Sequence, residues 1–497
     1  MTSIRKSKTS AISLAILIGL ISIGAFFRFD KIAEQSLWVD EYWALYLATG
    51  RGNLIFDMPL GRVIQSPPEV GFSGAPPWWH IWTGLASTPH PPLYHLALRF
   101  WVDLFGDGDL STRAMSAVFG IGCIVLIFDL VRQIHGDFSA LIAAGIMTFA
   151  APQIDFAQQV RPYTMLVFIG LILCKSVVLI ERRGLSPFRI FSLGISALCL
   201  ALTHHFSLGA ILAAALYGLI RFVGRKRCIF VSAIIFGLLL AAILWGPIAW
   251  KNRHGYIVGP NFGSSGGSLI AAIIDAPKKM VVGDAESRFI SYGLAFMAYI
   301  LPLLKMRNRP QLLFWWLWTI CTVGVVVAVD VLRGSQLVGM SRYIILASAG
   351  TYVLLSTSLE RGPGRLAPLA VLFAAATFGI ARWQTGSDYV RNTSAVARLI
   401  EKKVGPRDGV IIAGHFDSDP AFRYFIIAHY AGDWRNPVVL LAKPADSKLN
   451  KELALFRRVW VIGYDGADMR LLPGWKITEF HGGDPGFCLW KIAPSGT

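Results

Sequence analysis

Residues 11–27, AISLAILIGLISIGAFF, form an unbroken apolar run that begins shortly after Arg5, Lys6 and Lys8. A helix of about 17–25 mostly apolar residues is long enough to cross a bilayer. The run ends in Phe26-Phe27-Arg28-Phe29, which lacks the small residues of a signal-peptide cleavage site. We therefore interpret it as a retained first span whose N-terminus lies in the cytosol.

Further apolar runs of similar length follow along most of the chain. Only 15% of the residues are charged and 54% are hydrophobic, with a mean hydropathy of +0.54. Soluble domains are about 25% charged, so little of this surface is built to face water. The sequence predicts an all-α polytopic membrane domain of about eleven spans. The predicted spans are 11–27, 113–131, 138–153, 163–180, 188–203, 208–223, 229–246, 288–304, 312–330, 343–358 and 366–381.

The net charge of +17 is distributed in a way that favours a membrane protein over a nucleic-acid-binding one. Lys and Arg gather in every second link between the runs, which is the positive-inside pattern. With an odd number of spans, the C-terminus lies outside. The six cysteines form no CxxC pair, so neither a disulfide framework nor a thiolate metal site is supported.

Three segments lie outside the apolar runs. Residues 28–112 form a large extracytoplasmic first loop, rich in Pro and Trp, within a membrane domain of residues 1–381. A second outer segment, 247–288, contains Gly-Ser-Ser-Gly-Gly at 263–267 and is predicted to be a mobile loop. Residues 382–497 alternate strand-like and helix-like pieces, which indicates a small soluble α/β domain with parallel strands at 410–413, 438–442 and 459–462. No GxGxxG or P-loop supports nucleotide binding.

Unusual polar residues in or beside membrane segments are often functional. Here they fall in distant links that the topology places on the same outer face, so one extracytoplasmic cavity is able to collect them. The candidates are Asp40, Glu41, His90, Arg161, Tyr163, His204, Arg342 and Tyr343.

Several of these residues lie in motifs that resemble the GT-C membrane glycosyltransferases. Residues 37–42, LWVDEY, resemble the acidic motif of that family, and residues 90–96, HPPLYHL, resemble the HPPLYY segment of its bacterial branch. Residues 158–163, QQVRPY, resemble the family's Q-E-A-R-x-Y, with Gln159 in place of the acid, and residues 341–343, SRY, resemble its later R-Y motif. This branch is related to the dolichyl-phosphate-mannose protein mannosyltransferases and the lipid A aminoarabinose transferase.

The resemblance implies an enzyme that moves a hexosyl or pentosyl group from a polyprenyl-phosphate donor to a lipid, polysaccharide or protein of the envelope, with inversion. Asp40 would be the catalytic base, with Glu41 beside it. Arg161 and Arg342 suit the lipid phosphate, because guanidinium binds phosphate oxygens in a fork. His90, Tyr163, His204 and Tyr343 would line the substrate site. No cofactor is certain, and a divalent cation held by Asp40, Glu41 and His90 stays open.

Two further functions compete with this one: a transporter or flippase, and a non-catalytic assembly partner in envelope polysaccharide synthesis. The expected location is the bacterial inner membrane, with the C-terminal domain in the periplasm. Structural roles compete as well. Asp40 and Glu41 suit a helix start, and Arg161 and Arg342 suit interfacial anchors.

Overall fold

The computed structural model describes residues 10–497 except 89, 252–261, 263–267, 358–361, 387–392, 415–418, 433, 435, 464–465, 482–487 and 496–497. The segment 263–267, predicted to be mobile, lies outside the described residues. The chain forms two compact units. The first comprises Met1–Ile32, Thr88–Ala97 and Arg113–Ser387, and the second comprises Ala33–Ser87, Leu98–Thr112 and Asp388–Thr497.

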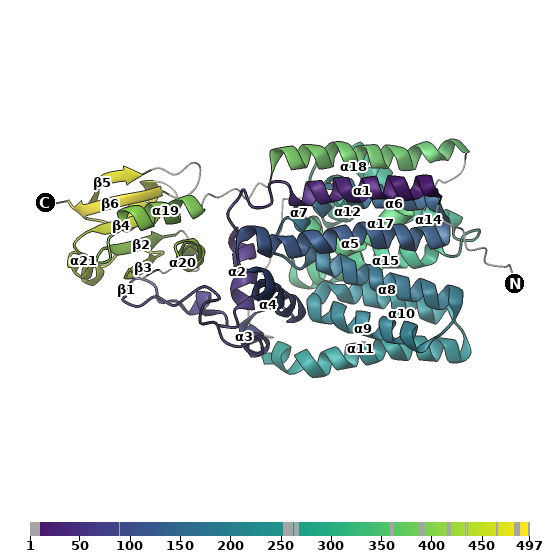
Figure 1. Cartoon of the computed structure of the whole chain (residues 1–497), viewed down its shortest axis with the longest axis horizontal. Coiled ribbons are helices and arrows are strands. Elements are labelled where there is room, and N and C mark those ends of the chain that lie inside the picture. Colours follow the sequence, from purple (N-terminus) through teal and green to yellow (C-terminus); the bar gives the residue numbers. More distant parts are fainter. Residues whose placement is uncertain are drawn as a thin grey trace. The chain divides into compact units, whose positions relative to one another are not determined.

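The first unit is a bundle of helices (Figure 1). Within the described residues, every predicted apolar run is largely helical, although several are broken. The helices are α1 (Ala11–Phe29), α5 (Asp109–His135), α6 (Asp137–Phe149), α7 (Ala151–Ala157), α8 (Tyr163–Arg183), α9 (Pro187–Thr203), α10 (Leu208–Arg221), α11 (Gly224–Lys251), α12 (Leu269–Val282), α13 (Arg288–Ala295), α14 (Leu301–Lys305), α15 (Leu312–Arg333), α16 (Ser341–Ile344), α17 (Ser348–Thr357) and α18 (Leu366–Thr385).

Six of the described helices are long and apolar enough to cross a membrane: α1, α5, α8, α11, α15 and α18. A seventh span results if the pair α6–α7, bent by 55°, counts as one. The chain is thus a multi-pass membrane protein, and the predicted number of about eleven spans is not reached by this criterion. The predicted spans that do not meet this criterion correspond to short or interrupted helices. Helices α9 and α10 are short, and a π-helical turn at Phe296–Ile300 separates α13 from α14.

The break between α6 and α7 has a local cause and a local compensation. Pro152 lies in the first turn of α7, where a missing N–H costs least. The break leaves the last carbonyls of α6 without helical partners. The fully buried Arg28 of α1 donates hydrogen bonds to two of them, those of Met147 (2.8 Å) and Thr148 (3.3 Å), and also to Gly24 of its own helix (3.0 Å). The first span is therefore fastened to the point where α6 ends.

Helix α12 lies within the segment that the sequence predicted to be a mobile outer loop. The side chain of Ser268 accepts a hydrogen bond from the backbone N–H of Ala271 (3.2 Å) and caps the helix. Its later residues, including Ala276 and Met280, are buried, and the hydroxyl of Tyr352 donates to the Met280 carbonyl. The prediction is therefore corrected for Leu269–Val282, because a capped apolar helix follows the glycine-rich stretch.

The second unit combines the first loop with the C-terminal part of the chain. Its helices are α2 (Val39–Ala48), α3 (His80–Gly84), α19 (Thr393–Lys403), α20 (Asp419–Tyr430) and α21 (Ser447–Leu453), together with the greater part of α4 (Leu93–Phe105). Its sheet has the order β1-β3-β2-β4-β6-β5. The strands are β1 (Val63–Ile64), β2 (Gly409–Ala413), β3 (Val438–Leu441), β4 (Val459–Gly463), β5 (Trp475–His481) and β6 (Cys488–Pro494).

The three central strands β2, β3 and β4 are parallel, as their alternation with helices predicted, and β5 and β6 form an antiparallel pair. Strand β1 was not expected. It comes from the first loop and pairs antiparallel with β3 at the edge of the sheet, with Val63 opposite Val439 (Figure 1). The sheet is thus completed by a segment that lies far upstream in the sequence.

Candidate active site

The predicted site residues fall into two sets, one in each unit. In the second unit, Asp40 and Glu41 occupy the first turn of α2. Glu41 is 1% exposed, and its Oε2 accepts a hydrogen bond from the backbone N–H of Trp38 (3.2 Å). That bond is the N3-to-N-cap half of a capping box. Asp40 is half-buried. The two carboxylates therefore differ: Glu41 is buried and caps the helix, whereas Asp40 is the more exposed of the two.

The start of α2 is held by a residue of the C-terminal part. The hydroxyl of Tyr430, at the end of α20, accepts the backbone N–H of Leu37 (2.6 Å) and donates to the carboxylate of Asp109 (2.9 and 3.0 Å). Leu37 lies three positions before Asp40. Sequence reasoning missed this contact, because nothing local in residues 419–430 indicates a partner in the first loop.

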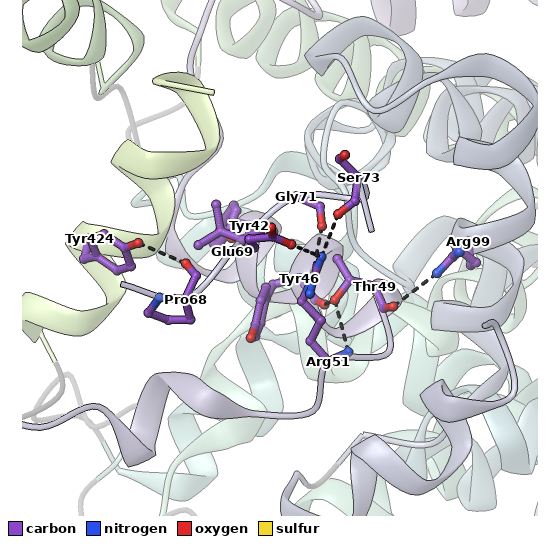
Figure 2. A network of polar contacts seen from close by, with 11 residues as sticks. Tyr42, Tyr46, Thr49, Arg51, Pro68, Glu69, Gly71, Ser73, Arg99 and Tyr424 are labelled. Carbon is purple, nitrogen blue, oxygen red and sulfur yellow. Dashed lines mark hydrogen bonds and ion pairs between the residues drawn. The ribbon is translucent and has the colours of Figure 1, made fainter. Parts of the chain in front are cut away.

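The end of α2 is held by a second network, drawn in Figure 2. Arg51 donates to the carbonyls of Gly71 (3.3 Å) and Ser73 (2.7 Å) and pairs with Glu69 (3.0 Å). Arg99 of α4 donates to the carbonyl of Thr49 (3.1 Å), the residue that ends α2. The helix that carries Asp40 is thus fixed at both ends within its unit.

The same loop is also tied to α20. In Figure 2 the ring of Tyr424 points toward the loop, and its hydroxyl donates to the carbonyl of Pro68 (3.0 Å). Tyr42 of α2 donates to the carbonyl of Val70 (3.3 Å), and the ring of Tyr46 packs edge-on against Phe425 (4.9 Å between centroids). Burial raises the pKa of the Tyr42 phenol well above its usual value, so this hydroxyl acts as a donor.

In the first unit, the predicted cationic and aromatic residues lie together. Arg161, 7% exposed, donates from Nη2 to the hydroxyl of Tyr163 (3.2 Å), and its guanidinium lies 5.5 Å from the Tyr163 ring centroid. Tyr163 and His204 have ring centroids 6.4 Å apart. The ring of His90 lies 5.9 Å from that of His95, a buried residue of the HPPLYH segment that the site prediction did not include.

The cluster continues toward the later motif through an aromatic residue. Phe206 contacts His204 (5.5 Å) on one side and Tyr343 (5.4 Å, edge to face) on the other. The guanidinium of Arg342 lies 5.0 Å from the ring centroid of Tyr343. Segments separated by well over a hundred residues therefore meet here. We call the set of His90, His95, Arg161, Tyr163, His204, Phe206, Arg342 and Tyr343 the cationic–aromatic cluster.

The electrostatics of this cluster favour an anion. Burial and the nearby Arg161 guanidinium, in that order, hold the pKa of His90 well below its usual value. Burial, then His205 and Arg161, lower the pKa of His204 to about 3. Both imidazoles are thus neutral at physiological pH, because burial disfavours their charged forms and the neighbouring Arg161 guanidinium adds to that effect. The guanidinium itself would stabilise a phosphate oxygen.

Other polar residues of the outer links have structural roles. The Nε of Arg382 donates to both carboxylate oxygens of Asp155 (2.9 and 3.0 Å). Gln158 donates to the carbonyls of Phe27 and Asp30 (2.8 and 2.9 Å). The carboxylate of Asp330 accepts from Ser335 and from the backbone N–H groups of 337 and 338 (2.6 to 2.9 Å). Each fastens a loop or a helix end.

The suggested cation site gains no support. Within the described part of the chain, no group of three or more His, Cys, Asp or Glu side chains has the geometry to hold a metal ion.

Comparisons with known proteins agree with the sequence motifs. Residues 89–250 match the family described as dolichyl-phosphate-mannose-protein mannosyltransferase. The fold is similar to that of ArnT from Cupriavidus metallidurans in the apo state, with a TM-score of 0.61 and 13% identity over 97% of this chain and 98% of that chain. The same protein bound to undecaprenyl phosphate matches with a TM-score of 0.57 and 11% identity over the same shares.

An archaeal protein is similar as well. The oligosaccharyltransferase AglB from Archaeoglobus fulgidus, in complex with an inhibitory peptide and a dolichol-phosphate, matches with a TM-score of 0.51 and 10% identity over 91% of this chain and 69% of that chain. No curated protein sequence matches. The resemblance seen in the motifs is thereby confirmed: this multi-pass membrane protein has the fold of the GT-C glycosyltransferases, and its residues 89–250 match the mannosyltransferase family within them.

Proposed function

We propose that this chain transfers a sugar from a polyprenyl-phosphate donor to an acceptor of the cell envelope, with inversion at the anomeric carbon. The observation that carries the proposal is the cationic–aromatic cluster of the first unit. It unites two arginines and two neutral histidines with tyrosines in a protein of the GT-C fold. The proposed location is the bacterial inner membrane, with the site on the periplasmic face. The acceptor is a lipid, a polysaccharide or a protein.

The cluster suits the phosphate of the donor. Guanidinium groups bind phosphate oxygens through paired N–H donors and remain charged in a buried site. Arg161 is almost fully buried and is oriented by Tyr163, so its position is set before a ligand arrives. The relatives bound to undecaprenyl phosphate and to a dolichol-phosphate support a lipid phosphate as the ligand.

Asp40 suits the second task, which is to accept the proton of the attacking hydroxyl. Of the two neighbouring carboxylates, Glu41 is buried and caps α2, whereas Asp40 is half-buried. In the proposed step, the acceptor oxygen forms a bond to the anomeric carbon while the bond from that carbon to the phosphate oxygen breaks. The hydroxyl proton passes to Asp40, and the polyprenyl phosphate leaves with the bonding electrons, stabilised by Arg161 and Arg342. Attack opposite the leaving group inverts the configuration.

The test is turnover in reconstituted vesicles with a panel of undecaprenyl-phosphate sugars and membrane acceptors. Asp40→Asn should lower kcat by at least 100-fold, because general base catalysis contributes about 10²–10⁴-fold. Its matched control is Glu34→Gln, an exposed carboxylate of the same loop. Arg161→Ala should weaken donor binding, whereas Arg288→Ala, at an exposed arginine, should not.

Full turnover by Asp40→Asn would remove Asp40 from the mechanism. Lipid movement across the vesicle without sugar transfer would favour the flippase instead. If well-folded wild type neither binds nor consumes any donor of the panel, the transferase proposal fails.

A further inference from the structure

A groove between α9 and α11 lies away from the cationic–aromatic cluster and takes no part in the proposed transfer. It has a volume of about 750 Å³ and is lined by apolar side chains of both helices. They include Ile190, Phe191 and Ile195 from α9 and Ile229, Phe236 and Leu240 from α11. The volume lies within the range of about 300–1,000 Å³ that is typical of ligand sites.

The two helices run side by side in the same direction. A Cβ placed on Gly194 of α9 would lie 3.1 Å from the carbonyl oxygen of Ala233 in α11, and one on Gly237 would meet the carbonyl of Gly194. Near both N-terminal ends the groove is bounded by Pro187 and Cys228. The N-termini of the two helices therefore lie at the same end of the groove.

The groove is open along its outer side. Phe191 is 66% exposed and Phe236 is 67% exposed, although both line an apolar wall. Helix α11 is one of the candidate spans. Exposed aromatic side chains on a spanning helix face lipid rather than water, so the occupant of the groove comes from the membrane.

The N-terminal end of the groove is strongly basic. Arg189 lies one turn into α9, and Arg225, Lys226 and Arg227 open α11; we call these four residues the basic rim. Between residues 182 and 251 the sequence contains no Asp or Glu. The preceding acid, Glu181, is paired with Arg221 (2.9 Å). The positive charge of the rim is thus not balanced by carboxylates of its own helices.

Three members of the rim are held in place by the protein. Arg189 donates to the carbonyls of Arg183 (2.9 Å) and Gly184 (2.8 Å), and Arg227 donates to that of Phe222 (2.6 Å). The ammonium of Lys226 lies 4.2 Å from the Phe222 ring centroid. Arg225 is exposed. All four cations lie within three residues of Pro187 or Cys228, which bound the groove at this end. An apolar groove beside such a basic segment matches a lipid whose anionic headgroup is joined to hydrocarbon chains.

We propose that the groove between α9 and α11 binds an anionic glycerophospholipid, with an acyl chain along the groove and the phosphate at the basic rim. The binding site is independent of the transferase proposal. Its test is native mass spectrometry of the full chain, purified in detergent, with phosphatidylglycerol or phosphatidylcholine of identical acyl chains as probe. Wild type should bind phosphatidylglycerol at least fivefold more tightly.

Two pairs of variants locate the site. Arg225→Gln should weaken phosphatidylglycerol binding about fivefold, since a basic residue near an anionic headgroup contributes about 1 kcal/mol. Arg307→Gln, at an exposed arginine of another link, should have no effect. Ser232→Trp places a large ring in the groove and should abolish the preference, whereas Ala242→Trp, at an exposed position farther along α11, should keep it.

Equal binding of the two lipids, or undiminished phosphatidylglycerol binding by Ser232→Trp, would overturn the proposal. So would displacement of phosphatidylglycerol by equimolar undecaprenyl phosphate, because the groove would then serve a polyprenyl lipid. None of these results depends on sugar transfer, so they leave the proposed function to its own test.

Discussion

The C-terminal part of the chain positions the acidic segment through one hydroxyl, and Tyr430→Phe removes that hydroxyl alone. In the wild type it accepts the N–H of Leu37 and donates to the carboxylate of Asp109. A hydrogen bond to a charged group contributes about 1.5–3 kcal/mol. Because both side chains are half-buried, water partly replaces the lost contact, and the lower end of that range applies. We expect a loss of about 1.5 kcal/mol.

That loss should be local. Since about 1.4 kcal/mol corresponds to a tenfold change in an equilibrium constant, the first turn of α2 should open about ten times more often. Hydrogen–deuterium exchange followed by mass spectrometry measures this directly in peptides that cover Val39–Ala48. Exchange in the helices of the first unit should stay unchanged.

Tyr46→Phe is the matched control on α2 itself. The Tyr46 hydroxyl is buried and has no hydrogen-bond partner among the described residues. Removing an unsatisfied buried hydroxyl should leave exchange unchanged or slow it. If Tyr430→Phe exchanges in α2 like the wild type, the hydroxyl does not hold the helix. A rise spread evenly over the whole chain would also refute the reasoning, because it would indicate global destabilisation.

Three further predictions concern stability, each measured as a thermal midpoint in detergent. The pKa of His204 is depressed to about 3 in the folded chain, so the unfolded chain binds this proton first as the pH falls below about 6.5. The free energy of unfolding should therefore decrease by about 2 kcal/mol between pH 7 and pH 5, and His204→Asn should reduce this decrease. A larger decrease in the variant than in the wild type would contradict the prediction. Asp155→Asn should lower the free energy of unfolding by about 1 kcal/mol, because it weakens the ion pair with Arg382, while sugar transfer persists. Loss of transfer at unchanged stability would instead place this carboxylate in the site. Gly379→Ala should be strongly destabilising, because a Cβ there would overlap the last carbonyl of α6. Gly293→Ala, with open space around it, should stabilise the protein by up to about 1 kcal/mol. Equal effects of the two variants would show that close packing of α18 is unimportant.

Hydropathy located the helices of the first unit because lipid-facing helices are apolar over their whole length. It did not locate their interruptions. The break before Ala151 depends on Pro152, and the π-helical turn at Phe296–Ile300 has no equally plain sequence signal. Helix α12 was missed because the glycines before it suggest a loop, although Ser268 followed by apolar residues is a helix start.

The choice of candidate site residues was possible from the sequence because these residues lie in ordered motifs. Arg161 and Tyr163 stand two residues apart in one motif, which brings them near each other, but the contact of Phe206 with Tyr343 depends on tertiary packing. The capping role of Glu41 had only half of the usual signal, since an acid stands at the third helical position but Trp38, rather than Ser or Thr, stands at the N-cap. Strand β1 had none, because two residues carry no periodicity and their partner lies in the C-terminal sheet.

The pairing of β1 with β3 also restricts how the chain is threaded through the membrane. Hydrogen-bonded strands lie on the same side of a bilayer, because the hydrocarbon core would otherwise separate them. Between Ile64 and Val438 the chain therefore crosses the membrane an even number of times. Among the described residues, the six long apolar helices include α1, which precedes β1. The other five follow β1, and five is an odd number, so these five alone cannot be the full set of crossings.

Counting the bent pair α6–α7 as a crossing restores an even number. The ten runs predicted after the first satisfy the same condition. If the assignment of every other segment is kept, α9 and α10 both cross the membrane or neither does, because one alone would make the number odd. This two-residue strand thus requires an even number of membrane crossings between β1 and β3. Any revised count of spans in this interval must therefore also be even.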